Sequence, residues 1–251
     1  KLINELLLQF PKNINNYHEI FLGGGSILFT ILFAINHNHI QLKNNIYAYD
    51  INPILINTYI YVQQSPIELY NCILDIINIY KSCNGDIINR EPIDINEATT
   101  SKESFYFWIR SKFNILKSKN EFTLELSAMF IFINKTCFRG MYREGPNGMN
   151  IGYGNYKNPS IINYEHILTI SNLIQNVQFI CCDYSESMIK FYKNDFIYLD
   201  PPYFPINNKS FVAYTYNGFT LEQHKKLFDL CNNIHDSYFI LHNSNTPIIH
   251  E

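Results

Sequence analysis

The strongest chemical signal in the sequence is Asp200-Pro201-Pro202-Tyr203, directly after the apolar run 196–199. A carboxylate and the carbonyl of the first proline can each accept an N–H bond from an exocyclic amine such as adenine N6, which localises the nitrogen lone pair for attack. Proline suits such a carbonyl because it fixes φ and brings no competing N–H group. The tyrosine ring offers a stacking face to a base that has left its helix. The string predicts a catalytic loop, in preference to a plain Pro-Pro turn after a strand.

A glycine-rich string precedes this loop in the chain. Residues 21–25 read Phe-Leu-Gly-Gly-Gly, and glycines after a first strand let the backbone approach a ligand closely. The spacing G-x-G-x-x-G is incomplete because position 28 holds leucine, which argues against a nicotinamide dinucleotide. The string predicts a loop where the backbone approaches a ligand closely, with a plain turn as the alternative.

An acid ends the next apolar segment. Asp50, followed by Ile51, comes directly after residues 46–49. An acid at this place accepts hydrogen bonds from ribose hydroxyls in nucleotide-binding α/β units. The alternative is a cap for the helix that starts at Asn52-Pro53.

A second acid stands at a comparable place. Asp183 and Tyr184 follow the apolar segment 177–180. Asp183 either binds an adenine amino group or caps a turn, and Tyr184 either stacks on a ligand or packs in the core.

The elements that must position these residues alternate along the chain. Apolar segments predict strands at residues 19–22, 46–49, 177–180, 196–199 and 238–241. Helical patterns cover residues 2–10, 27–36, a stretch from 52 onwards, and 221–232. This order predicts an α/β protein with an open sheet, whose strands each end on a polar residue at the edge where ligands bind.

The middle of the chain has a different character. Residues 59–162 show helical patterns with few convincing strands, and within 101–160 nine Lys and Arg residues stand against four Glu residues. We expect an inserted, mainly helical domain that binds a polyanion, with a solvated helical face as the alternative. Residues 1–58 and 163–251 then form the catalytic, cofactor-binding domain.

Composition excludes several classes of protein. The 251 residues are 47% hydrophobic and carry a formal charge of −3, which rules out a disordered chain and a uniformly basic nucleic-acid coat. The sequence contains no run of eighteen apolar residues, so no membrane span is predicted. The six cysteines lack C-x-x-C spacing and the histidines form no ligand pattern, so we expect no metal site and a reducing compartment.

Four strings in this order, FLGGGSILF, YAYDINP, FICCDYSE and FIYLDPPYFP, resemble the Dam-type (D12 class) DNA adenine-N6 methyltransferases. The resemblance spans about residues 1–245 and implies a Rossmann-like sheet that binds S-adenosylmethionine, with an inserted helical domain and a hairpin that read double-stranded DNA. Carried over by position, it implies cofactor contacts by Phe21, Gly23, Gly24, Gly25, Asp50, Ile51, Asp183, Tyr184 and Asp200. It implies catalysis by Asp200, Pro201, Pro202 and Tyr203.

The string at residues 132–159 resembles the target-recognition segment of this family. Asn134, Lys135, Arg139 and Arg143 are its candidates for reading a base or holding phosphates. Tyr214, in the aromatic segment 210–219, is a further candidate for contact with DNA. Residues 137–140 depart from the Asn-Gly of many GATC-specific members, so no target sequence is predicted.

A second departure concerns the amino-terminal end. The family usually carries a Gly-Lys segment before the first helix, and this sequence begins at Lys1 without Met. It also stops just after an apolar run, and we expect that both ends have been cut.

These observations lead to one hypothesis with two alternatives. We expect a site-specific methyltransferase that moves a methyl group from S-adenosylmethionine to a flipped adenine in duplex DNA. The alternatives are an adenine methyltransferase on RNA or single-stranded DNA, and a degenerate DNA-binding module without catalysis. We expect the protein in the cytoplasm or wherever its target genome lies, and not secreted. The biological role and the oligomeric state are left open.

Overall fold

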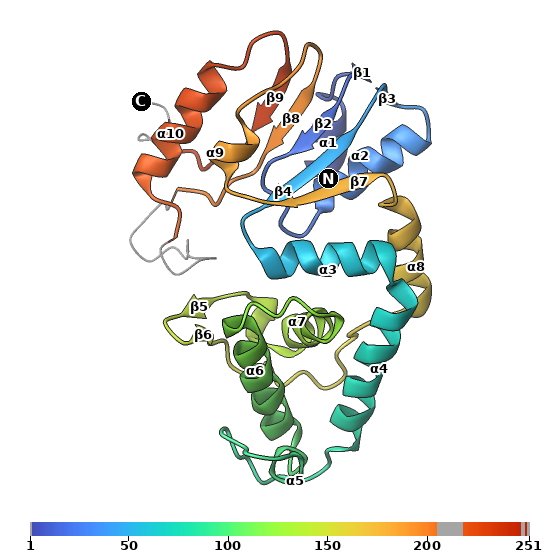
Figure 1. The fold of residues 1–251 in the computed structure, drawn as a ribbon, viewed down its shortest axis with the longest axis vertical. Helices are drawn as coiled ribbons and strands as arrows, with labels where there is room; N and C mark the ends of the chain where they lie inside the picture. Colours follow the sequence, from blue (N-terminus) through green and yellow to red (C-terminus); the bar gives the residue numbers. More distant parts are fainter. Residues whose placement is uncertain (1, 205–217, 247–248, 250–251) are drawn as a thin grey trace. The chain divides into compact units, whose positions relative to one another are not determined.

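The structure is a computed structural model that describes residues 2–204, 218–246 and 249 (Figure 1). The chain divides into two compact units. The first consists of the described parts of residues 1–56, 172–213 and 217–251, and the second contains residues 57–171. The assignment of cofactor binding to one unit and DNA recognition to the other stays a prediction.

The first unit is built on one five-stranded sheet. Its strands are β2 (Tyr17–Glu19), β4 (Ile46–Asp50), β7 (Val177–Cys181), β8 (Phe196–Leu199) and β9 (Tyr238–Leu241). They lie in the order β7-β4-β2-β8-β9, and every neighbouring pair is parallel. The order reverses between β2 and β8, which makes these two central strands the switch point of the sheet. This architecture confirms the predicted α/β, Rossmann-like class.

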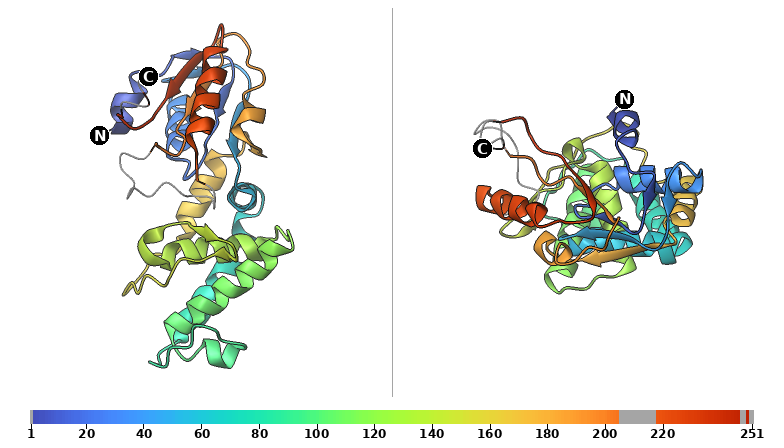
Figure 2. Two further views of the ribbon diagram at one scale, coloured as in Figure 1. Left: turned by 90° about the vertical axis from the view of Figure 1, so that its left-hand side faces the viewer. Right: turned by 90° about the horizontal axis from the view of Figure 1, so that it is seen from above.

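Helices cover both faces of this sheet. On one face, α9 (Tyr184–Ser187) and α10 (Leu221–Asn232) enclose a core that includes Ile20, Tyr49 and Leu227. On the other face, Phe10 packs against Phe196 and Tyr198 with ring centroids 5.0 and 6.1 Å apart. Figure 2 shows α1 (Leu2–Leu7) and α2 (Ser26–Asn36) on the side of the sheet away from α9.

Two predicted boundaries were wrong at the start of this unit. The first strand was expected at residues 19–22, but it covers Tyr17–Glu19, because its polar members His18 and Glu19 are buried in the sheet centre. The chain after it stays hydrogen-bonded to the neighbouring strands, since Ile20 N donates to the Tyr198 carbonyl and Leu22 N to the Tyr49 carbonyl. The first helix was expected to reach residue 10 and ends at Leu7.

Three elements of this unit had no predicted counterpart. The short strands β1 (Asn13–Ile14) and β3 (Gln41–Leu42) pair in parallel, and α9 is a single turn. Strands of two residues are too short for an alternating pattern to mark them. The helix α10 and the strands β8 and β9 have the predicted bounds.

The second unit is mainly helical. Its elements are the main part of α3 (Pro53–Gln64), α4 (Pro66–Ser82), α5 (Ile95–Ala98), α6 (Lys102–Ser118), α7 (Leu124–Thr136), the 3₁₀ turn η1 (Phe138–Gly140), and most of α8 (Tyr164–Leu173). Rings of Tyr80, Phe105 and Phe132 meet in its core, with centroids 5.3 to 6.4 Å apart. A two-stranded antiparallel hairpin, β5 (Glu144–Gly145) and β6 (Gly148–Met149), follows η1. No helix in the described part of the chain is long and apolar enough to span a bilayer.

Candidate active site and DNA-recognition segment

Two loops leave neighbouring strands at the switch point of the sheet. The glycine loop follows β2, and residues 200–203 follow β8, which pairs with β2 in parallel. Glu19 on β2 stands opposite Tyr198 on β8, so both strands end at the same edge. In open α/β sheets this crevice, at the carboxyl ends beside the reversal of strand order, is where ligands bind.

The glycine loop has a conformation that ordinary residues adopt only with strain. Gly23 has φ +48° and Gly25, the N-cap of α2, has φ +69°. A Cβ atom added to Gly23 or Gly24 would meet no atom within 4 Å. The loop therefore borders open space, and the need for glycine at Gly23 and Gly25 comes from backbone conformation.

Asp50 ties this loop to the next strand. Its Oδ2 accepts a hydrogen bond from Gly23 N at 3.0 Å, and its Oδ1 accepts one from Asn52 N at 2.9 Å. Burial raises the pKa of Asp50, while the backbone N–H groups that it accepts from act in the opposite direction. The cap of α3 comes from a different residue, since Asn52 Oδ1 accepts from Ile54 N at 3.1 Å.

The structure thus separates the two interpretations of this acid. Asp50 holds the glycine loop and does not cap α3, so its carboxylate lies beside the space over that loop. Ile51, the next residue, is 56% exposed, which is high for a large apolar side chain. Contact of Asp50 and Ile51 with a cofactor stays a prediction.

Asp183 and Tyr184 both have structural partners. Asp183 caps α9, and its Oδ1 accepts from Ser185 N at 2.9 Å and from Ser185 Oγ at 2.6 Å. Tyr184 is buried, its hydroxyl donates to the Gln223 carbonyl at 3.1 Å, and its ring lies 5.7 Å from Phe21 and 5.5 Å from Phe219. Both residues therefore have the capping and packing roles of the alternative interpretation, and a contact with cofactor stays a prediction.

The predicted catalytic loop presents its first and last residues to solvent. Asp200 is exposed, Pro201 is buried, and Pro202 is half-buried. Tyr203 is 47% exposed, and burial, the charge of Asp200 and a hydrogen bond to Asp200 raise the pKa of Tyr203 to about 12. The Tyr203 hydroxyl is therefore neutral at ordinary pH, and its half-exposed ring is accessible for stacking.

Polar side chains hold the residue that follows this loop. Phe204 N donates to Asn243 Oδ1 at 3.1 Å, and Ser244 Oγ donates to the Phe204 carbonyl at 2.7 Å. Asn243 Nδ2 lies 3.2 Å from Nδ1 of the buried His224 on α10. The chain after β9 thereby fastens the end of the predicted catalytic loop.

One buried acid at this edge was missed by the sequence analysis. Glu19, the last residue of β2, is 2% exposed, and its Oε2 accepts a hydrogen bond from Tyr17 OH at 2.7 Å. Burial raises the pKa of Glu19 to about 8, the Tyr17 hydrogen bond opposes this, and the charge of Asp200 adds to it. The signal available in the sequence was an acid two residues before the glycine-rich string, at the start of the predicted strand 19–22.

The predicted recognition residues lie on the end of α7 and the segment after it. Asn134 and Lys135 are in the last turn of α7, and Lys135 is exposed. Arg139 is an exposed non-glycine residue at φ +57° in η1, and its guanidinium lies 5.2 Å from the ring centroid of the exposed Phe138. A cation in such a strained position is a candidate for function. Tyr214 lies outside the described residues.

The hairpin after η1 is held at its base by side chains of α6. Asn114 Nδ2 donates to the Met149 carbonyl at 3.0 Å, and Asn114 Oδ1 accepts from Met149 N at 2.9 Å. Arg110 donates to the Ile151 carbonyl at 2.6 Å. Arg143 remains exposed while its Nε donates to Asn150 Oδ1 at 2.8 Å. The hairpin is thus a supported structure that presents a cation.

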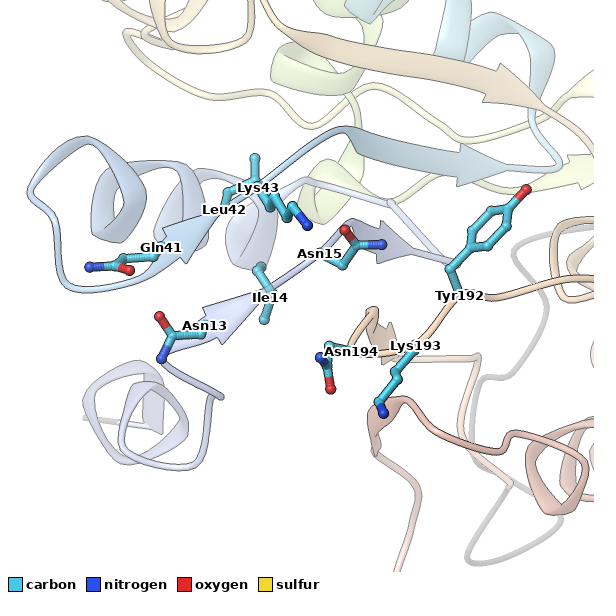
Figure 3. Close-up of a pocket in the computed structure, with 9 residues that line it drawn as sticks. All are labelled: Asn13, Ile14, Asn15, Gln41, Leu42, Lys43, Tyr192, Lys193 and Asn194. Atoms are coloured by element: carbon cyan, nitrogen blue, oxygen red, sulfur yellow. The ribbon is translucent and has the colours of Figure 1, made fainter.

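A pocket of the first unit lies at another place. A space of about 740 Å³ lies beside β1, β3 and residues 192–194, at the amino ends of the strands (Figure 3). Its polar lining consists of carboxamides, Lys43, Lys193 and Tyr192, and it contains none of the predicted site residues. Among the residues that the structure describes, no group of three His, Cys, Asp or Glu side chains is placed to hold a metal ion.

Comparison with known proteins now identifies the class. The sequence model of the family described as D12 class N6 adenine-specific DNA methyltransferase matches residues 1–251, and the chain belongs to this family. This confirms the predicted family and its activity class, a DNA adenine methyltransferase.

Individual relatives agree with this membership. The chain is 32% identical to the type II methyltransferase M.MjaIII of Methanocaldococcus jannaschii, over 86% of this chain and 70% of the relative. It is 26% identical to the type II methyltransferase M1.LlaDCHI of Lactococcus lactis subsp. cremoris, over 100% of this chain and 80% of the relative. It is 29% identical to the DNA adenine methylase of Haemophilus influenzae, over 93% of this chain and 71% of the relative.

Proposed function

We propose that this chain transfers a methyl group from S-adenosylmethionine to N6 of an adenine that is flipped out of a short motif in double-stranded DNA. The observation that carries the proposal is the pair of loops at the switch point. The exposed Asp200 and Tyr203 follow β8, and the glycine loop follows its neighbour β2. One loop suits an amine on an aromatic base, and the other borders open space beside an acid.

The residues of the glycine loop fit S-adenosylmethionine. The acid Asp50 at the end of β4 suits ribose hydroxyls, and the space over Gly23 and Gly24 admits a ligand close to the backbone. The exposed Ile51 offers an apolar surface to an adenine ring. When bound, the cofactor supplies an electrophilic methyl group on a sulfonium sulfur.

The catalytic loop supplies the groups that orient the target amine. We infer that the Asp200 carboxylate and the Pro201 carbonyl each accept one N–H bond from adenine N6, which localises the nitrogen lone pair. The Tyr203 ring stacks on the flipped base. Pro202 restricts the backbone between them. No base of raised pKa is required, because the cationic product nitrogen releases its proton readily.

The second unit supplies the groups for duplex DNA in this proposal. Lys135, Arg139 and Arg143 carry exposed charge near the hairpin, which suits phosphates or the O6 and N7 atoms of guanine. Asn134, beside Lys135, is a further candidate for reading a base. Flipping lets the amine reach a loop that could not contact it inside the helix.

The test is methyl transfer from labelled S-adenosylmethionine to unmethylated genomic DNA, with nucleoside analysis and single-molecule mapping of the product. N6-methyladenine at one recurring motif is the expected result. Asp200→Ala should lower the rate by about 10²–10³-fold while duplex binding is retained. The control Asp229→Ala removes an exposed acid on α10 and should leave the rate unchanged. Transfer by Asp200→Ala at the normal rate would contradict the mechanism.

A further inference from the structure

A short hydrogen-bond network joins the predicted catalytic loop to α10 and to the chain after β9. Phe204, the residue directly after Tyr203, is bound at both of its main-chain groups: its N–H donates to Asn243 Oδ1 and its carbonyl accepts from Ser244 Oγ. Asn243 Oδ1 also accepts from Ser244 N at 2.8 Å. The end of the loop is therefore fixed by side chains that are distant in the sequence.

The donors and acceptors of this network are determined by chemistry. Since Asn243 Oδ1 accepts two main-chain N–H groups, its Nδ2 is the donor that faces His224 Nδ1 at 3.2 Å. His224 must then accept at Nδ1, which is the neutral ring with its proton on Nε2. Burial lowers the pKa of His224, which agrees with a neutral ring in this place.

His224 itself sits in a rigid setting. Its side chain is fully buried, and its ring centroid lies 4.6 Å from Phe219 and 5.7 Å from Phe204. The helix that carries it begins with a capping box between Thr220 and Gln223. Four residues into a capped helix, the imidazole has little freedom to follow a moving loop.

We propose that Asn243 and His224 are positioning residues for methyl transfer, which act by holding the main chain at the end of the 200–203 loop. In this role they act through the main chain and not by contact with the base or the cofactor. The inference rests on the proposed function, because it concerns the loop assigned there to the target amine. Catalysis by two fixed acceptors is sensitive to displacement, and a shift of about 1 Å lowers a rate by about 100-fold.

The test compares three variants of the full chain with wild type. Asn243→Leu keeps the side-chain size and removes every hydrogen bond of the amide. Asn243→Asp keeps the acceptor for Phe204 N and for Ser244 N, and His224 can donate to it in its other tautomer. Ser244→Ala removes only the bond to the Phe204 carbonyl. The control is Asn232→Leu, which makes the same Asn-to-Leu substitution at an exposed position of α10.

Single-turnover methyl transfer is measured beside the dissociation constants of cofactor and duplex, the melting temperature, and the fluorescence of 2-aminopurine at the target position. We expect Asn243→Leu to lower the single-turnover rate by about 30- to 100-fold. Both dissociation constants should stay within about threefold. Ser244→Ala should lower the rate by about three- to tenfold, roughly the loss of one hydrogen bond. Asn243→Asp should restore most of the rate, and 2-aminopurine should respond differently in Asn243→Leu and wild type.

Two outcomes overturn the inference by itself. The first is that the wild type is active and that Asn243→Leu and Ser244→Ala both transfer the methyl group at the wild-type rate. The second is that Asn243→Leu loses rate and Asn243→Asp does not restore it, while every variant loses DNA and cofactor binding and melting temperature to the same extent. The loss of rate would then reflect a loss of folding. A wild type that transfers no methyl group to any DNA overturns the proposed function, and this inference with it.

Discussion

The buried acid Glu19 makes the stability of the first unit depend on pH. Its carboxyl group is 2% exposed at the end of the central strand β2, where an ionised form has no neighbouring cation among the contacts that the structure describes. Burial raises its pKa from the ordinary value of 4.5 to about 8. We therefore expect the folded chain to keep this carboxyl protonated at neutral pH, while the unfolded chain ionises it.

The sign and size of the effect follow from linkage. Between pH 4.5 and about 8 the folded state binds one proton more than the unfolded state, so the free energy of unfolding falls as pH rises. The stabilisation is fully present below pH 4.5 and is lost as pH rises through about 8. At about 1.4 kcal/mol per pH unit, the loss between pH 5 and pH 8 approaches about 4 kcal/mol.

The substitution Glu19→Gln removes the titration and keeps the shape. The Gln carbonyl can accept the bond from Tyr17 OH that Glu19 Oε2 accepts now. Urea unfolding followed by circular dichroism from pH 5 to pH 8 should show the variant gaining on wild type by about 4 kcal/mol at the upper end. Glu222→Gln, at an exposed position of α10, is the matched control. Parallel stability curves for wild type and Glu19→Gln would refute the argument.

Two further predictions concern backbone and hairpin. Gly23→Ala places a Cβ at φ +48° and should lower the free energy of unfolding by about 1–2 kcal/mol. Gly24→Ala should cost less, because no positive φ is required at that position. Thermal unfolding without ligand measures both variants, and equal melting temperatures would contradict this prediction. Asn114→Ala removes two hydrogen bonds of about 1 kcal/mol each from Met149 and should lower discrimination between the target motif and sites changed at one base by about tenfold. Rates on both kinds of site measure this, with the exposed Asn96→Ala as control, and an unchanged ratio would show that the hairpin is positioned by other contacts.

The sequence predicted best where apolar pattern and burial coincide. All four residues of β8 are apolar or aromatic and buried, and its bounds were predicted without error. The first strand shows the opposite case. His18 and Glu19 are buried polar residues, so a pattern based on apolar residues placed this strand too late in the chain. Burial of polar groups depends on partners from distant segments, such as Asp195 beside His18 at 3.3 Å, which no local pattern reveals.

Part of the candidate site could be predicted from the sequence, and part needed the structure. The type and order of Gly23, Asp50 and Asp200 pointed to one edge of the sheet, and the strand order places the loops that carry them there. The competing roles of Asp50 and Asp183 could not be separated from sequence, because both acids precede a helix. Three-dimensional structure separates them: Asp183 caps α9, while Asn52 caps α3 and leaves Asp50 to the glycine loop.

The 200–203 loop and the hairpin after η1 are both held through main-chain atoms. Asn243 and Ser244 bind the N–H and carbonyl of Phe204, and Asn114 binds the carbonyl and N–H of Met149. Main-chain anchors specify where a loop ends without specifying the side chains that it presents. The hairpin tip at residues 146–147, which is exposed, can therefore change in sequence while its base keeps its place. If the proposed mechanism holds, substitutions at this tip should change the target motif and leave the 200–203 loop in place.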